Sequence, residues 1–519
     1  MRIKKYCNIS LVIITLLTIN VYAQKNQNKI IVNVDSGKYT ISRHIYGHFS
    51  EHLGRCIYGG IWVGKESSTP NTQGIRNDVV TALKALNIPN LRWPGGCFAD
   101  EYHWKDGIGP PEQRPTIINT HWGGITEDNS FGTHEFMDLC QMLGCEPVIC
   151  GNLGSGTVRE MSQWIEYLNS DNVSPMTSMR KQNGRQKPWK VQYWDIGNEN
   201  WGCGGSMTAE FYADQMRRYS TFCKNYGNNQ LYRIACGPYG DDYHWMEVLM
   251  KDKKNRNRFQ GISLHYYTGT REEEIRSSTN FTEKQWFNIL EKALRMDEII
   301  TNHKTIMDRY DPQKKKGLIV DEWGTWYEAE PGTNPRFLYQ QNTLRDALVA
   351  ALTLDIFNHH SDRVRMANIA QTVNVLQAMI LTKEDQMVLT PSYYVFKMYK
   401  VHQDATNLPL SITCEDYTFD NNSIPAVSAS VSRNEQGQIH ITLTNCNPKK
   451  PLTLTCELQG INKVRIKHAE IITAEKIDSH NDFGKPEKVY IKEFKSLKAE
   501  KNTISINIPS KSIVMVKLK

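Results

Sequence analysis

Residues 191–226 read VQYWDIGNENWGCGGSMTAEFYADQMRRYSTFCKNY and join a short apolar run to a longer amphipathic one. The run 191–196 is typical of a buried strand, and the apolar residues of 209–226 recur at helical spacing. A polar, glycine-rich loop links the two parts. The stretch is therefore predicted to form one strand–loop–helix unit.

Units of this kind recur along most of the chain. Further predicted strands cover residues 45–49, 90–93, 146–150, 232–236, 261–265, 317–321 and 365–369. The amphipathic segments between them include 75–86, 133–143, 283–300 and 341–357. Eight such alternations predict a (β/α)₈ TIM barrel of the α/β class over residues 45–403, and a doubly wound open sheet is the alternative.

The pattern changes after the barrel. Period-2 alternation takes over in runs such as 439–443, 452–456 and 504–508, which Asn, Pro or Gly residues bound. Residues 404–519 are therefore predicted to form an all-β sandwich of jelly-roll type. The alternating run 30–34, within residues 24–44, is predicted to add a strand to it, and the polar stretch 170–187 to form a surface loop.

The composition is that of a folded globular chain, with 39% apolar and 23% charged residues among 519. A formal charge of only +7 predicts no nucleic-acid partner. Residues 1–23 place three basic residues before an apolar run and end in Val-Tyr-Ala. This pattern predicts a signal peptide cleaved near Ala23 and export to the periplasm or the exterior. Because no later stretch approaches 18 apolar residues, no membrane span is expected.

Two glutamates stand where a barrel enzyme carries its reacting groups, at the ends of strands. Glu199 follows the predicted strand 191–196, and Glu322 follows 317–321. Two carboxylates on either side of a sugar can protonate the departing oxygen and attack the anomeric carbon. We expect Glu199 to be the acid/base and Glu322 the nucleophile of a glycoside hydrolase; ordinary surface glutamates are the alternative.

Other polar or aromatic side chains surround this pair. Arg92 is expected to keep Glu322 ionised through charge-assisted hydrogen bonds, unless it is a structural arginine of the barrel mouth. His265 suits either a sugar hydroxyl or a carboxylate, and Trp122 suits either a sugar platform or a loop anchor. The residues expected to bind substrate are Glu51, Arg92, Trp122, Asn198, His265, Tyr267 and Gln371.

Metal and nucleotide sites are not expected. His48 and His52 lie across a strand end without an evident third ligand, and His134 lacks the second histidine of a zinc-protease helix. No glycine-rich phosphate loop occurs in the sequence. We therefore expect neither a metal ion nor a cofactor.

Six motifs on six predicted strand ends carry a family resemblance. They are IYGHFSEHLGRCIYGGIW (45–62), LRWPGGCFADEYHWKDGIGP (91–110), WDIGNENWGCGG (194–205), SLHYYTG (263–269), DEWGTWY (321–327) and ANIAQTVNVL (367–376). In this order they resemble the α-L-arabinofuranosidases of glycoside hydrolase family 51. The similarity runs from about residue 30 to the C-terminus.

The resemblance implies a (β/α)₈ barrel with a β-sandwich built from both termini, and a retaining hydrolase that removes terminal α-L-arabinofuranosyl groups. It places the acid/base on Glu199, the nucleophile on Glu322, and the sugar contacts on the seven residues named above. Trp122 lies in a loop that aligns poorly. Arabinan, arabinoxylan and their oligosaccharides are the implied partners, and a homo-oligomer, commonly a hexamer, is implied as well.

A disulfide is predicted from positions alone. Cys97 lies five residues after Arg92, and Cys203 lies four residues after Glu199. Both can reach the rim of one pocket, and a bond between them would hold the two loops together. Two free thiols are the alternative.

Two other functions fit part of the sequence. An endo-acting enzyme on β-linked glucan or xylan would use the same carboxylates in an open groove lined by Trp122 and Trp201. A glycan-binding protein without catalysis would need no paired acids. The pair Glu199 and Glu322 favours hydrolysis over binding alone.

Overall fold

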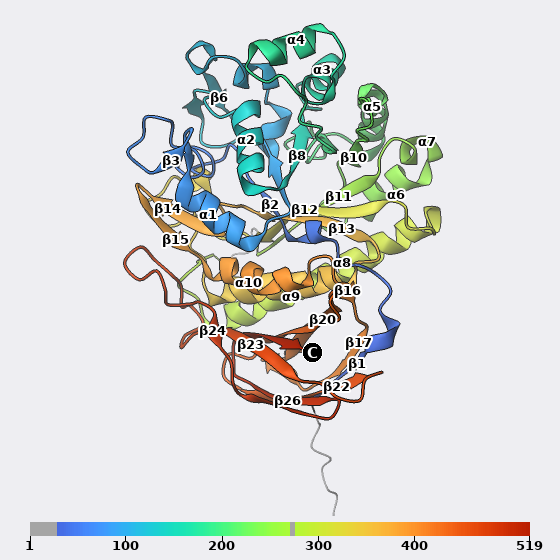
Figure 1. Cartoon of the computed structure of the whole chain (residues 1–519), viewed down its shortest axis with the longest axis vertical. Helices are drawn as coiled ribbons and strands as arrows, with labels where there is room; N and C mark the ends of the chain where they lie inside the picture. Colours follow the sequence, from blue (N-terminus) through green and yellow to red (C-terminus); the bar gives the residue numbers. More distant parts are fainter. Residues whose placement is uncertain (1–27, 270–275) are drawn as a thin grey trace, which may run out of the picture.

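The computed structural model describes residues 28–269 and 276–519. A barrel surrounded by helices forms the upper part of the molecule in Figure 1, and a sheet-rich domain forms the lower part. The predicted signal peptide, residues 1–23, lies outside the described residues. None of the helices in the described ranges combines the length and the apolar character needed to cross a membrane.

Eight parallel strands within the described residues close into a barrel, as predicted. Strand β13 pairs with β2 and completes the circle, since Asn368 faces Gly47 in the register. The strands are β2 (Gly47–Phe49), β5 (Asn90–Trp93), β8 (Glu146–Gly151), β9 (Tyr193–Ile196), β10 (Tyr232–Ala235), β11 (Gly261–Thr268), β12 (Gly317–Thr325) and β13 (Val364–Ala370).

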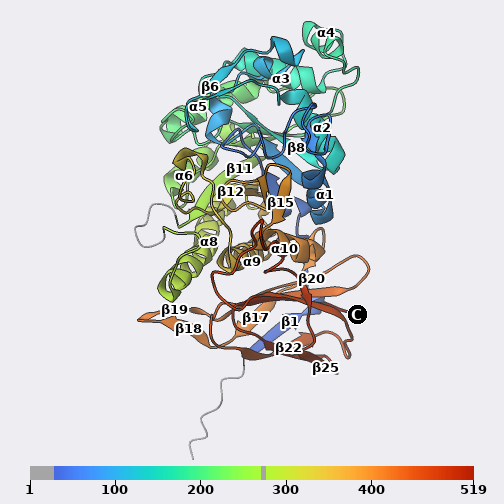
Figure 2. The same ribbon diagram turned by 90° about the vertical axis from the view of Figure 1, so that its left-hand side faces the viewer.

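Helices surround this barrel, and most of them are amphipathic and pack an apolar side against it. Figure 2 shows them from a second direction. The main helices are α1 (Asn77–Leu86), α2 (Thr133–Leu143), α3 (Val158–Asn169), α5 (Ala209–Phe222), α6 (Tyr243–Lys251), α8 (Glu283–Tyr310), α9 (Leu344–His359) and α10 (Pro391–Tyr399). The barrel interior has its own small apolar cluster, made of Val148, Ile234, Ile319 and Met366.

Two antiparallel-rich sheets form the lower domain. One has the order β17-β1-β22-β26-β25 and the other β16-β20-β21-β27-β23-β24. The strand β1 (Lys29–Asn33) pairs in parallel with β22 and antiparallel with β17, so the N-terminal strand belongs to this domain. The remaining strands are β16 (Thr406–Asn407), β17 (Leu410–Thr413), β20 (Val427–Arg433), β21 (Ile439–Asn445), β22 (Leu452–Gln459), β23 (Ile466–Thr473), β24 (Lys492–Glu493), β25 (Leu497–Glu500), β26 (Thr503–Ile508) and β27 (Ser512–Leu518).

Helix α9 joins the two domains. It lies between the barrel and the sandwich in Figure 1, and its residues from Leu344 to Asn358 are all buried. A helix that is largely apolar on every side is expected in such a position. Its one deeply buried acid near the sandwich, Asp355, accepts hydrogen bonds from Ser428 on β20 and Thr442 on β21.

The prediction of a surface loop over 170–187 is wrong in part, because the stretch contains helix α4 (Pro175–Gln182). Ser174 accepts a hydrogen bond from the backbone N–H of Thr177, and Pro175 occupies the first turn, where its missing N–H costs nothing. The guanidinium of Arg180 is buried and donates to the carbonyls of Tyr167 and Ser170. These polar contacts stabilise α4 in place of an apolar face, so apolar periodicity does not predict the helix.

Candidate active site

The structure brings the predicted site residues together at the carboxyl ends of the barrel strands. Tyr267 lies near the end of β11, Glu322 lies in the second half of β12, and Arg92 lies on β5. Glu51, Asn198–Glu199 and Gln371 follow β2, β9 and β13 within three residues. Trp122 comes from the turn between two short strands, β6 (Ile117–Asn119) and β7 (Ile125–Glu127), which extend the loop after β5.

Glu199 and Glu322 face each other across His265. Nδ1 of His265 lies 2.8 Å from Oε1 of Glu199 and 3.5 Å from Oε2 of Glu322. One carboxylate oxygen of each glutamate and a ring nitrogen of His265 all lie within 4.8 Å of one another. The carboxyl groups of Glu199 and Glu322 therefore lie close together in the same site.

Arg92 binds three acids, which lie on the two strands β9 and β12. Its guanidinium lies 2.9 Å from Glu322, 2.8 Å from Asp195 and 3.4 Å from Asp321. It also donates to Oδ1 of Asn198 at 2.7 Å. This contact with Glu322 is the one expected from the sequence, whereas Asp195 and Asp321 were not expected to take part.

Asp321 and Glu322 are neighbours in sequence, and regular strand alternation would point them to opposite faces. Both nevertheless contact Arg92, because β12 carries a bulge. Between the pairs Ser263–Ile319 and His265–Glu322, β12 has one residue more than β11. A bulge of this kind redirects side chains and is frequent next to active sites.

The pKa of His265 is raised in this setting. Burial lowers its pKa, but the charges of Glu322 and Asp321 outweigh burial and raise the pKa well above its ordinary value. Nε2 lies 3.2 Å from Oδ1 of Asp321. His265 therefore contacts carboxylates through both ring nitrogens, and these contacts favour its protonated form.

Several neighbouring groups shift the pKa of Glu322 in opposite directions. The net effect is a raised pKa, because burial and the charge of Glu199 together outweigh His265 and Arg92, which lower the pKa. The hydroxyl of Tyr267 donates to Oε2 at 2.8 Å and also favours the ionised form.

Glu51 provides a further buried carboxyl. It accepts hydrogen bonds from the N–H of Phe98, from Nε1 of Trp122 at 2.8 Å and from Nε2 of Gln371 at 3.0 Å. Burial, together with the charge of Glu322, raises its pKa to about 8 despite these donors. Trp122 is thus fixed by its indole N–H and remains half-buried.

Among the residues predicted to bind substrate, two side-chain atoms have no protein partner among the described residues. They are Nδ2 of Asn198 and Oε1 of Gln371, and both side chains are buried. A buried polar atom without a partner costs about 1–3 kcal/mol. The amide donor and the carbonyl acceptor are therefore ready to bind hydroxyl groups of a ligand.

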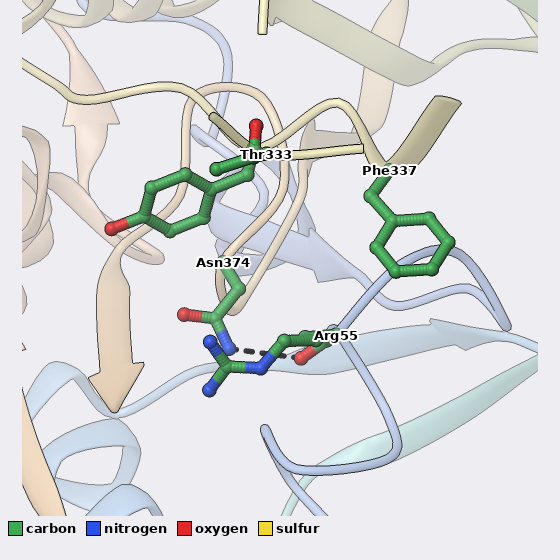
Figure 3. Close-up of a pocket in the computed structure, with 5 residues that line it drawn as sticks. Arg55, Thr333, Phe337 and Asn374 are labelled. Atoms are coloured by element: carbon green, nitrogen blue, oxygen red, sulfur yellow. Dashed lines mark hydrogen bonds between the residues drawn. The ribbon is translucent and has the colours of Figure 1, made fainter. Parts of the chain in front are cut away.

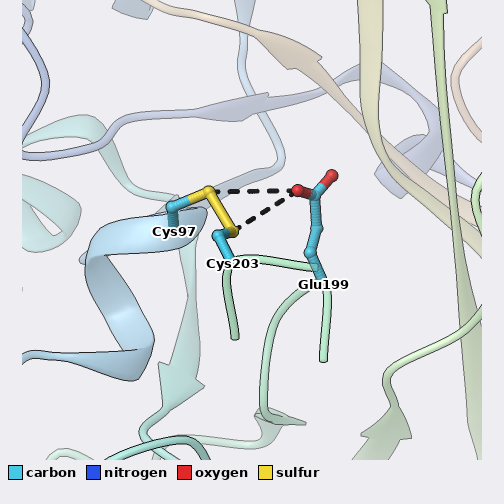
Figure 4. Close-up of side chains that lie close together, drawn as sticks. All are labelled: Cys97, Glu199 and Cys203. Carbon is cyan, nitrogen blue, oxygen red and sulfur yellow. Dashed lines mark hydrogen bonds between the residues drawn. A yellow bond between two sulfur atoms is a disulfide. The ribbon is translucent and has the colours of Figure 1, made fainter. Parts of the chain in front are cut away.

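Cys97 and Cys203 form a disulfide beside Glu199 (Figure 4). Their sulfur atoms lie 3.9 and 3.5 Å from Oε2 of Glu199. Because a disulfide has no S–H to donate, these are packing contacts. The pair was hypothesised from its sequence positions, and it closes the Glu199 side of the site.

Metal binding was not expected, and the structure contains two groupings that bear on it. Cys97, Glu199 and Cys203 lie close together, but both sulfurs are in the disulfide and cannot act as thiolates. Glu199, His265 and Glu322 form the second grouping. Here the proton on His265 satisfies the carboxylates, and the absence of a metal stays a prediction.

A small separate cavity of about 100 Å³ lies among the loops after β2, β12 and β13 (Figure 3). Its polar groups are used within the protein, since Nδ2 of Asn374 donates to the carbonyl of Arg55 and the Arg55 guanidinium donates to the carbonyl of Thr382. The cavity is lined by Arg55, Thr333, Phe337, Tyr339 and Asn374, none of which was predicted as a site residue.

Family models match most of the chain. The α-L-arabinofuranosidase 1 domain matches residues 82–286, and the α-L-arabinofuranosidase C-terminal domain matches residues 321–512. The first match spans strands β5 to β11 of the barrel, and the second begins at Asp321 in β12 and ends at the start of β27 in the sandwich.

Known proteins match over nearly the whole length. An enzyme of Bacteroides ovatus named intracellular exo-α-L-arabinofuranosidase is 54% identical over 503 residues, which cover 96% of this chain and 97% of that protein. The crystal structure of a family 51 arabinofuranosidase from Xanthomonas axonopodis pv. citri matches with a TM-score of 0.93 and 50% identity, covering 95% and 100%. The arabinose complex of the Thermotoga maritima α-L-arabinofuranosidase matches with a TM-score of 0.83 and 29% identity, covering 95% and 99%.

The predicted export of the protein is wrong by this comparison, because the Bacteroides ovatus relative is named intracellular and aligns with 96% of the chain. The signal-peptide prediction loses its support with it. It rests on three basic residues, an apolar run and the sequence Val-Tyr-Ala that ends residues 1–23. Such a run is a compositional signal, and composition does not show that a cleavage machinery acts on it.

The family resemblance found in six sequence motifs is confirmed by both kinds of comparison. The closed barrel and the sheet-rich domain fit the matched structures. The chain belongs to the α-L-arabinofuranosidases of glycoside hydrolase family 51.

Proposed function

We propose that the protein is a retaining exo-acting hydrolase that releases terminal α-L-arabinofuranosyl groups from arabinan, arabinoxylan or their oligosaccharides. The observation that carries the proposal is the proximity of Glu199 and Glu322. Two of their oxygens lie within 4.8 Å. Retaining enzymes hold their carboxyl groups about 5–5.5 Å apart, whereas inverting enzymes need about 6.5–9.5 Å to admit a water.

The two acids take different roles because they have different partners. Arg92, Tyr267 and His265 all donate toward Glu322, which favours the charged form that a nucleophile needs. Glu199 has one such donor, His265, and packs its other oxygen against the disulfide. Glu322 attacks the anomeric carbon while Glu199 protonates the leaving oxygen.

The second step reverses the role of Glu199. After the first step Glu199 is ionised, and it removes a proton from the water that attacks the arabinosyl-enzyme. The configuration at the anomeric carbon is then retained after two inversions.

Substrate is held by the groups around the acids. Nδ2 of Asn198 and Oε1 of Gln371 are buried without protein partners, so they suit two sugar hydroxyls. Glu51 and Trp122 form a hydrogen-bonded pair next to Gln371 and give the sugar a polar and an aromatic wall. The exo action is supported by the name of the Bacteroides ovatus relative.

The test compares nitrophenyl α-L-arabinofuranoside with the β-D-xyloside and the β-D-glucoside. We expect release from the arabinofuranoside, and the Glu199→Ala variant should regain turnover with azide and form the α-configured azide. Activity confined to glucan or xylan substrates would move the protein to the endo-acting alternative. Binding of arabino-oligosaccharides without any turnover would favour the glycan-binding alternative.

A homo-oligomer, commonly a hexamer in the family that the sequence resembles, is part of the proposal. Large apolar side chains such as Phe211 and Phe222 on α5 are about half exposed, at 52% and 49%. Burial of such side chains favours association. Light scattering coupled to size exclusion measures the oligomer directly, and a monomer at micromolar concentration would contradict it.

A further inference from the structure

The loop that carries Glu199 has a costly backbone conformation. Glu199 has φ of +43°, in the left-handed region, and Gly197 before it has φ of +85°. For a residue other than glycine this conformation costs about 1–2 kcal/mol. It persists only where the surroundings determine it. The contacts that hold this loop are therefore worth identifying.

A single helical turn after β5 holds the loop at two points. This turn, η3 (Cys97–Asp100), begins with the cysteine that is bonded to Cys203 and ends with Asp100. Cys203 follows Glu199 by four residues, so the disulfide anchors the loop after Glu199. Asp100 anchors the loop at Asn198, the residue before Glu199.

The carboxylate of Asp100 accepts four hydrogen bonds. Oδ2 accepts from the backbone N–H of Asn198 at 2.8 Å and from Nδ2 of Asn200 at 3.2 Å, the two residues that flank Glu199. Oδ1 accepts from the backbone N–H groups of Leu153 and Gly154 at 2.6 and 2.7 Å. Asp100 thus connects the loop after β9 with the loop after β8.

The packing around Asp100 leaves little freedom. Asp100 is buried, and a Cβ at Gly204 would collide with its Oδ2 and with the carbonyl oxygen of Asn198. Nδ2 of Asn200 also donates to the carbonyl of Gly204 at 2.7 Å. The segment from Asn198 to Gly204 is therefore wrapped around one carboxylate.

We propose that Asp100 is a positioning residue that sets the backbone of Glu199 and so aims its carboxyl at the leaving oxygen. This inference rests on the proposed function, in which Glu199 is the acid/base. Asp100 itself contacts Asn198 and Asn200. Its hydrogen bonds within the described residues include none to Glu199 or Glu322.

The test uses the leaving group to separate acid catalysis from other losses. An α-L-arabinofuranoside with an acidic leaving group such as 2,4-dinitrophenol needs no protonation, whereas the methyl arabinofuranoside does. In Asp100→Asn, an NH₂ group replaces one acceptor oxygen. Because that oxygen accepts two hydrogen bonds from N–H groups, both bonds are lost. We expect kcat/KM for the methyl glycoside to fall by about 10–100-fold, since a misplacement of about 1 Å costs that much, and kcat/KM for the activated glycoside to stay within about threefold.

Asp355→Asn is the matched control. Asp355 is equally buried, and burial raises the pKa of both acids to about 7, but Asp355 lies at the sandwich interface. We expect its variant to retain kcat/KM for both substrates even where its melting temperature falls as much as that of Asp100→Asn. If Asp100→Asn does not fold, Asn200→Ala replaces it, because it removes one of the two Asp100 contacts beside Glu199.

Equal losses on both glycosides in Asp100→Asn, or no loss on either, would overturn the inference. Glu199→Ala is measured in parallel, and its loss should be confined to the methyl glycoside in kcat/KM. If Glu199→Ala shows no such difference, the role of Glu199 is wrong, and the inference falls with the proposed function. If Glu199→Ala shows it and Asp100→Asn does not, only the inference fails.

Discussion

The two halves of the barrel interior are filled in opposite ways. We call the half toward the amino ends of the strands the lower half, and the half toward their carboxyl ends the upper half. The lower half is the apolar cluster of Val148, Ile234, Ile319 and Met366. Two residues further along the same strands, Cys150 contacts the guanidinium of Arg92, and Asp321 lies 3.4 Å from it. One strand, β12, thus changes from a close-packed apolar side chain to an ionic one within a single alternation.

The contrast between the two halves shows that one stabilises the fold and the other serves the reaction. Apolar burial contributes to stability without directional requirements. Buried ion pairs often contribute little, because desolvation offsets their attraction, but removing one partner is costly. The upper half therefore holds Arg92, His265 and their carboxylates for what they do to a substrate, and the lower half supports them.

The largest expected effect comes from Glu322→Ala, which removes the attacking oxygen from the upper half. We expect kcat/KM to fall by at least about 10⁴-fold on every arabinofuranoside, whatever its leaving group, as losses of a nucleophile do. The melting temperature should stay close to that of the wild type. Added azide should give the inverted β-azide, and wild-type rates with an activated glycoside would refute the assignment of Glu322.

Replacing Arg92 tests whether the upper half also carries stability. Arg92→Met leaves Glu322, Asp195 and Asp321 without their shared cation, which we expect to cost about 3–5 kcal/mol in the free energy of unfolding and to abolish turnover. Urea unfolding and arabinofuranoside hydrolysis measure the two effects.

Arg363→Met is the control for Arg92. Arg363 is fully buried and binds Asp308 and Asp311 at the end of α8, away from the site. It should lose similar stability while the folded enzyme keeps its turnover. Loss of activity in both variants to the same extent would show that the contrast between the two halves is one of folding alone.

A smaller effect is expected from Ile234→Ala in the lower half. The variant leaves a cavity in the barrel interior, and we expect a loss of about 2–5 kcal/mol in the free energy of unfolding. β10 carries none of the predicted site residues, so kcat/KM per folded molecule should be unchanged at temperatures below unfolding. A loss of turnover without loss of stability would contradict the division.

The smallest effect on activity is expected from Asp355→Asn, which tests whether charge burial alone marks a functional site. Burial raises the pKa of Asp355 to about 7, compared with about 3.9 in an unfolded chain. Between about pH 4 and pH 7 the folded state then binds more protons than the unfolded state, so the free energy of unfolding falls as pH rises. The contribution is complete below about pH 4 and lost as pH passes 7.

Asp355→Asn should make this fall with pH shallower than in the wild type and leave turnover unchanged. Urea midpoints at pH 4.5 and pH 7.5 measure the change, and the wild type provides the reference for the other buried acids. An unchanged dependence on pH would show that Asp355 does not titrate in this range.

Much of the fold was predictable because burial leaves a period in the sequence. The predicted strand 90–93 coincides with β5, and the predicted helix 133–143 coincides with α2. Helix α4 was missed because its stability comes from Ser174 as N-cap and from the buried Arg180. Neither leaves an apolar period, although Ser-Pro before a polar run is a recognisable start signal.

The site was predictable to the extent that its residues end strands. Glu51, Arg92, Glu199, Glu322 and Gln371 were found in this way, and they converge in the structure. Asp195 and Asp100 were not found. Asp195 stands inside a predicted strand and Asp100 inside a loop, and only their contacts with Arg92 and with the Glu199 loop show their importance.

The sequence by itself determined the barrel, the sandwich and the family, because apolar periodicity and ordered motifs are local properties of a chain. Only the tertiary structure decided which charges meet. The bulge in β12 places both Asp321 and Glu322 on Arg92, and the turn at Cys97–Asp100 holds the Glu199 loop from both sides. These contacts join residues about 100 to 230 positions apart, and their energies depend on geometry and burial that no local pattern records.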